Sequence, residues 1–146
     1  MNEFDECPTE GALGLLTLLI KTGRLAESRL DEALASENLT FVKWRTLEAL
    51  VKANSPVCLG ELAKSINCVK SNVTQLADKL QAEGIVKRVA DPNDRRSILI
   101  ELTGQGFRVH QAGLKAMETT TRKLFSSSTE PDRIALRDLL GKLDGR

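Results

Sequence analysis

Apolar residues recur every three or four positions along much of this chain, a spacing that places them on one face of a helix. The clearest case predicts a helix that begins after Thr40, a capping residue, and ends near Ala53, where Asn54-Ser55-Pro56 interrupts the pattern. Its buried face comprises Phe41, Trp44, Leu47, Leu50 and Val51. One amphipathic helix is therefore expected over residues 41–53.

Three further helices are expected towards the two ends of the chain. One begins near Thr9 and ends at the polar break 36–38. Its first half is apolar over most of its circumference, which predicts burial on several sides. A second helix begins at Thr103 and ends near Phe125, and a third follows Thr129.

The centre of the chain has a different pattern. A short helix over 61–66 leads into a longer amphipathic helix over about 69–83, which Gly84 stops. Two β-branched runs follow, 85–90 and 97–102, joined by a polar loop. This order of helix, turn, helix and hairpin predicts a winged helix-turn-helix.

The expected fold is mainly α with a small antiparallel β-hairpin, in which a winged helix-turn-helix core is flanked by N- and C-terminal dimerisation helices. The length of 146 residues fits a single domain. Residues 40–102 are expected to form a DNA-binding lobe, with 1–36 and 103–146 as a helical dimerisation region. The flanking helices either pack on the winged core alone or pack on a second copy of the chain. We favour the homodimer, because a small core leaves these helices little else to bury against.

The polar residues at the start of the longer central helix are candidates for reading DNA bases. Short polar side chains in this position can reach base edges when the helix lies in the major groove. They are Lys70, Ser71, Asn72, Thr74 and Gln75. An amphipathic helix whose polar face is merely solvated would show the same pattern, so the adjoining hairpin has to support the interpretation.

The hairpin loop carries a doubled arginine, Arg95 and Arg96. Arginine is attracted to the narrow minor groove of A·T-rich DNA, and Asp94 is expected to hold an arginine side chain in place. Lys79 and Arg88 are expected to contact phosphates. The alternative is an exposed polar hairpin with incidental charge.

Composition narrows the function further. The net charge is only +1, but basic residues outnumber acidic ones over 69–100, while acidic residues dominate 1–36. An anionic partner should therefore meet the middle of the chain. We find no phosphate-binding loop, nucleophile elbow or metal-ligand set, so an enzyme is not expected. With no apolar run long enough to span a bilayer, we expect a cytoplasmic protein that does not bind membranes.

The region from Leu62 to Gly106 combines Leu80, Gly84, Val86 and Arg88 with Asp94-Arg95-Arg96, Leu102-Thr103 and Gly106. This combination resembles the winged helix-turn-helix core of the MarR family of bacterial transcription regulators. It implies a homodimer on a palindromic DNA site, with Asp94 and Arg96 as the wing motif. One departure is Val69, where the family often has Ser or Thr as a helix cap. Either Asn67 caps one turn earlier or the cap is poor.

The resemblance also implies a signal, either a small-molecule effector, often aromatic, or an oxidant. If the family layout holds, the walls of a ligand pocket would include Leu13, Leu16, Trp44, Arg45 and Leu47. Cys7 is the candidate for oxidation, because it lies near the start of a helix, where a thiol pKa is lowered.

Other titratable residues are expected to be structural. Cys58 and Cys68 lie within the helix-turn-helix as small core residues. The single histidine, His110, is expected to be partly exposed on a helix, so neither a metal nor a cofactor is predicted. The function expected is sequence-specific DNA binding that regulates transcription. The alternative is a protein-interaction module that kept the winged fold without sequence-specific DNA binding.

Overall fold

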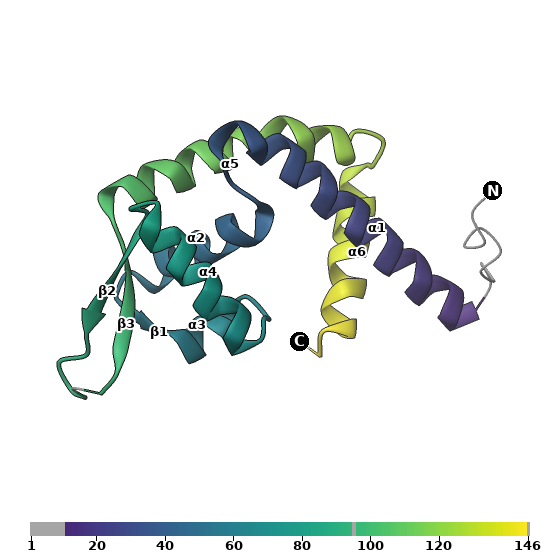
Figure 1. Ribbon diagram of the computed structural model, residues 1–146. Helices are drawn as coiled ribbons and strands as arrows, with labels where there is room; N and C mark the ends of the chain where they lie inside the picture. The colour runs from purple at the N-terminus through teal and green to yellow at the C-terminus, as the bar shows by residue number, and fades with distance from the viewer. Residues whose placement is uncertain (1–10, 95, 146) are drawn as a thin grey trace, which may run out of the picture.

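The structure is a computed structural model that describes residues 11–94 and 96–145. Helices dominate it, with one small antiparallel sheet, as the sequence predicted (Figure 1). The elements in chain order are α1 Gly11–Leu34, η1 Ala35–Glu37, α2 Phe41–Ala53, β1 Val57–Cys58, α3 Leu59–Ser65, α4 Lys70–Ala82, β2 Val86–Ala90, β3 Ile98–Leu102, α5 Gly104–Leu124 and α6 Glu130–Leu143.

Threonine side chains cap three helices where the sequence predicted a helix start. Thr40 accepts a hydrogen bond from the Lys43 backbone N–H at 3.3 Å, and Thr103 accepts one from Gly106 at 3.0 Å. Thr129 and Asp132 form a reciprocal capping box at the start of α6. These contacts confirm the predicted starts of α2, α5 and α6. The predicted cap at Thr9 lies outside the described residues.

The sheet has the strand order β1-β3-β2. Strands β2 and β3 form the predicted hairpin, with Arg88 opposite Ile100. The third strand, β1, is too short to show a pattern in the sequence. It pairs Val57 with Ile100 and Cys58 with Leu99, and so attaches the middle of β3 to the segment before α3.

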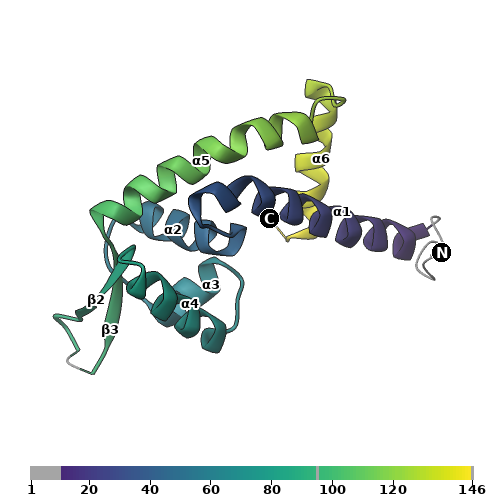
Figure 2. The same cartoon turned by 45° about the horizontal axis from the view of Figure 1, so that its top comes forward.

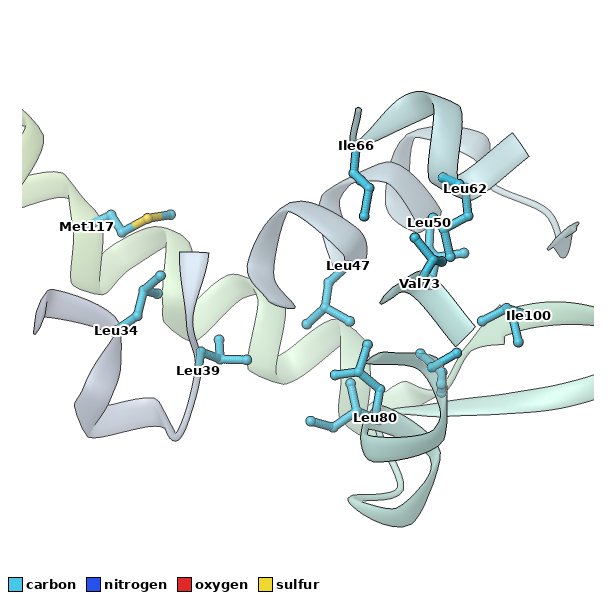
Figure 3. Packing of buried hydrophobic residues seen from close by; sticks show 14 residues of the cluster. Leu34, Leu39, Leu47, Leu50, Leu62, Ile66, Val73, Leu80, Ile100 and Met117 are labelled. Atoms are coloured by element: carbon cyan, nitrogen blue, oxygen red, sulfur yellow. The ribbon is translucent and has the colours of Figure 1, made fainter. Parts of the chain in front are cut away.

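The core has two adjoining parts (Figure 3). Leu62, Val73, Leu80 and Ile100 come from α3, α4 and the hairpin and are almost fully buried. Leu34, Leu39 and Met117 are buried where α1 and the chain before α2 meet α5. Leu47 lies between the two groups in Figure 3. The winged lobe and the long helices therefore share one continuous core.

The N-terminal half of α1 extends away from the winged lobe in both views (Figures 1 and 2). It and α6 carry large apolar side chains that this one chain leaves exposed. On α1 they are Leu13, Leu15, Leu16, Leu18, Leu19, Ile20 and Leu25, and on α6 they are Ile134, Leu136, Leu139, Leu140 and Leu143. An apolar surface of this extent is typical of a protein interface.

His110 corrects one expectation. It was expected to be partly exposed, but its side chain is only 3% exposed. Its ring stacks on Trp44 with centroids 5.3 Å apart, and its Nε2 lies 2.6 Å from the Glu48 Oε2. Hydrogen bonds from Lys52 and then from His110 lower the pKa of the Glu48 carboxyl. The histidine is thus part of the contact between α2 and α5.

The same contact depends on a glycine in the middle of α5. A Cβ atom at Gly113 would lie 2.7 Å from the Trp44 Cδ1 and 3.0 Å from the Leu39 Cδ1. We expect Gly113→Ala to lower the free energy of unfolding by about 1–3 kcal/mol, because a methyl group is forced into a packed core. Gly104→Ala in the same helix is the control, since a Cβ there meets nothing within 4 Å. Equal melting temperatures of the two variants would contradict this packing.

Candidate DNA-binding surface

The sharp connection between α3 and α4 sets the direction of α4. Asn67 takes a left-handed backbone conformation with φ 52°, and the Cys68 backbone N–H donates to the Ala63 carbonyl oxygen at 2.9 Å. Asparagine tolerates this conformation better than most residues. Val73, Ala77 and Leu80 then bury one face of α4 against the lobe, so that its opposite face points outward.

The predicted base-reading residues lie on that outward face. Lys70, Ser71, Asn72 and Gln75 are exposed. Thr74 is half-buried, and its hydroxyl donates to the Lys70 carbonyl oxygen at 3.0 Å. The Thr74 hydroxyl oxygen can still accept a hydrogen bond. The structure therefore presents most of the predicted polar set to solvent within the first turns of one helix.

The start of α4 has no side-chain cap. Val69 takes the N-cap position without a side-chain hydrogen bond, and its side chain is 62% exposed. The sequence left open whether Asn67 caps the helix one turn earlier or the cap is poor, and the structure shows the poor cap. The first-turn backbone N–H groups of α4 consequently receive no side-chain hydrogen bond from Val69.

The wing loop is held by aspartate side chains that accept backbone hydrogen bonds. Asp91 accepts from the Asn93 N–H at 2.8 Å, and Asp94 accepts from the Arg96 N–H at 2.9 Å. Asp94 therefore shapes the turn through the backbone of Arg96. The Arg96 side chain is exposed, and Arg95 lies outside the described residues.

Arg88 makes a contact that the sequence did not reveal. Its guanidinium group donates to the Asp78 carboxylate at 2.5 Å and so connects β2 to α4. The Asp78 side chain is 56% exposed, so this pair lies at the protein surface. Lys79 is exposed beside it. Arg88 thus links the wing strand β2 to α4.

The residues expected around a ligand pocket do not share one environment. Leu13 and Leu16 are exposed on α1, and Leu47 is fully buried in the core. Trp44 lines a cavity of about 600 Å³ and, together with Arg45, a second hollow of about 410 Å³. The larger cavity is lined by Leu30, Phe41, Trp44, Leu114, Met117, Glu118, Thr121, Arg122, Phe125 and Arg133.

The two cysteines that the structure describes do not share a site. Cys58 caps α3, with its Sγ accepting a hydrogen bond from the Glu61 N–H at 3.4 Å, and Cys68 is partly buried. Cys7 lies outside the described residues. Within residues 11–94 and 96–145, no group of His, Cys, Asp and Glu could hold a metal ion. In the same ranges, no helix is both long and apolar enough to cross a bilayer.

A helix-turn-helix with an exposed polar second helix and an arginine-bearing wing defines a winged-helix DNA-binding protein. The family model described as the MarR family matches residues 39–98, which span α2, the helix-turn-helix and the wing. Residues 39–98 therefore form a MarR-family domain, and MarR-family proteins are DNA-binding transcription regulators and not enzymes.

Individual relatives agree over most of the chain. The HTH-type transcriptional regulator PecS of Dickeya dadantii (strain 3937) is 25% identical over 145 residues, covering 98% of this chain and 87% of PecS. A cysteine-to-serine variant of Escherichia coli MarR complexed with operator DNA has the same fold, with a TM-score of 0.85 and 22% identity over 94% of this chain and 99% of that one. CouR from Rhodococcus jostii RHA1, bound to p-coumaroyl-CoA, gives a TM-score of 0.78 and 23% identity over 88% and 90%.

Proposed function

We propose that two copies of this chain bind a palindromic promoter site and that an effector changes this binding. In each copy, α4 would enter the major groove and the wing would reach the neighbouring minor groove. The observation that carries the proposal is the exposed polar start of α4 beside a wing that exposes Arg96. The operator DNA bound by the similar MarR structure supports the same class of partner. Such a role implies a cytoplasmic location.

The exposed apolar side chains of α1 and α6 support the homodimer. Leu15 is 66% exposed and Leu143 is 74% exposed in the single chain. Burying apolar surface of this kind contributes about 25 cal/mol per Å². A second copy of the same two helices would cover it, with α1 and α6 as the dimerisation region. The two copies of α4 would then meet half-sites about one helical turn apart.

Gln75 is the residue we expect to read a base most directly. Its side chain is exposed on α4, and an amide can form two hydrogen bonds with adenine. We expect Gln75→Ala to relax the preference at one base pair per half-site by roughly tenfold. Gln81→Ala, an exposed glutamine on the last turn of the same helix, is the matched control. Selection from randomised duplexes measures both, and an unchanged preference at every position in Gln75→Ala would refute this role.

The effector we propose is a small molecule, aromatic or otherwise, that binds in the 600 Å³ cavity. The aromatic side chains of Phe41, Trp44 and Phe125 line the cavity together with the cationic side chains of Arg122 and Arg133. This combination suits an aromatic anion. A ligand that binds only the native state raises the melting temperature. A thermal-shift screen of aromatic carboxylates with Trp44→Ala as the negative control tests the site.

Oxidation of Cys7 is the alternative signal. Under this hypothesis, peroxide releases the wild-type protein from DNA, and Cys7→Ser abolishes the release. Cys68→Ser is the control because Cys68 lies at the turn before α4. If peroxide still releases Cys7→Ser from DNA, Cys7 is not the sensor.

A further inference from the structure

One ion pair joins the start of α2 to the end of the recognition helix. The Lys43 ammonium lies 2.7 Å from the Glu83 Oε1, and the Lys43 side chain is only 14% exposed. The same ammonium donates to the Asn38 carbonyl oxygen at 3.5 Å. Asn38 follows η1, in the connection between α1 and α2. A single side chain thus contacts that connection and the α4 terminus together.

Glu83 is well placed for such a contact. It is the C-cap residue of α4, and its backbone N–H donates to the Lys79 carbonyl oxygen at 3.0 Å. Gly84 follows with φ +73° and turns the chain towards β2. The second carboxylate oxygen, Oε2, is buried without a hydrogen-bond partner among the described residues. The attraction of Lys43 is therefore the contact that holds this carboxylate in place.

The polar connection continues towards the proposed dimer interface. The Phe41 backbone N–H donates to the Asp31 carboxylate at 2.5 Å, which ties the start of α2 to the last turns of α1. Asp31 and Lys43 therefore both make contacts at the first turn of α2. They link α1, the first turn of α2 and the end of α4 in one series of contacts.

We propose that Lys43 and Glu83 are positioning residues that fix the recognition helix relative to the dimerisation helices. The inference rests on the proposed homodimer. Neither side chain has to touch DNA. In a dimer, their contact would set the separation of the two α4 helices, and so the half-site spacing that the protein accepts.

Operators with altered half-site spacing test the proposal. We would measure binding of wild type, Lys43→Met, Glu83→Gln and the double variant to the selected operator and to versions with one or two base pairs added or removed at its centre. A duplex with a single half-site is measured in parallel. Lys52→Met is the control. It also removes one positive charge from α2, but the ion pair that it breaks, with Glu48, lies within α2 itself.

We expect each single variant to reduce the discrimination between correct and altered spacing by about fivefold or more, with single-half-site affinity unchanged. The double variant should lose no more than either single one, because the two side chains act through one contact. Lys43→Arg should keep the discrimination, and so should Lys52→Met.

Three results would overturn the inference. Wild-type discrimination in both single variants would show that the pair does not set spacing. Equal loss of half-site and full-site affinity would show that the pair only maintains the folded lobe. Glu83→Gln is nearly isosteric, so it removes the ion pair even if Lys43→Met fails to fold. A wild-type protein that binds every duplex alike would instead contradict the proposed function itself, and the inference with it.

Discussion

Arg96→Ala is expected to weaken binding to the selected operator by roughly tenfold to a hundredfold, which corresponds to about 1–3 kcal/mol. The Arg96 side chain is exposed at the wing, and Asp94 fixes its backbone through a 2.9 Å hydrogen bond. A side chain held in this way gives up little backbone freedom when it enters a minor groove. The narrow A·T-rich groove has the strongest negative potential, so the loss should be largest for operators with A·T pairs at the wing position.

Arg108→Ala is the matched control. It removes the same side chain from an exposed position on α5. Both variants should melt like the wild type, because neither side chain is buried. Fluorescence anisotropy at one fixed salt concentration measures the affinities, since phosphate contacts make all such values depend on salt. Equal affinity of Arg96→Ala and wild type under these conditions would remove the wing from the binding surface.

The double substitution Leu139→Asp/Leu143→Asp is expected to convert the protein to a folded monomer. The two leucines lie one turn apart on α6 and are 58% and 74% exposed in the single chain. In the monomer their replacement is nearly neutral, whereas in a dimer each carboxylate would be buried without a partner, which costs several kcal/mol. Operator affinity should fall roughly a hundredfold or more, because the second half-site no longer binds as part of the same complex.

Arg137→Asp is the control for the dimer variant. It makes the same change in net charge from the same helix, and two residues along a helix place its side chain on nearly the opposite face from Leu139. Light scattering should show a dimer for Arg137→Asp and a monomer for the leucine variant. A dimer in both proteins would exclude this face of α6 from the interface.

Local chemistry explains why much of the fold could be predicted from sequence. Thr40, Thr103 and Thr129 each cap a helix through contacts within a few residues, so their roles are visible in a short window. The apolar spacing of α2 and the alternation of the hairpin likewise depend on neighbouring positions. The starts of these helices and the winged arrangement could therefore be predicted from the sequence.

Contacts between distant segments could not be predicted in the same way. His110 is buried because its ring stacks on that of Trp44, which lies 66 residues earlier in the chain. The Trp44 indole N–H also donates a hydrogen bond to the His110 carbonyl oxygen. The Lys43–Glu83 pair joins residues 40 positions apart. Neither pairing leaves a periodic signal. The strand β1 was missed because two residues are too few to alternate.

The candidate site shows the same division. The sequence placed the polar set on α4 and the arginines on the wing, and the structure exposes Gln75 and Arg96 as such a role requires. The sequence did not reveal that Asp78 pairs with Arg88, because each residue considered alone looks like a solvated charge. Candidates for DNA-contacting side chains can thus be proposed from the sequence, whereas the contacts that position them are visible only in the fold.

Selection of bound sequences from a pool of random duplexes tests the central claim most directly. The purified protein should enrich an inverted repeat whose half-site centres lie about one helical turn, roughly 10 base pairs, apart. A·T pairs are expected where the wing meets the minor groove. Enrichment of a single unrepeated half-site would contradict binding as a symmetric dimer, and no enrichment at all would contradict sequence-specific recognition by α4 and the wing.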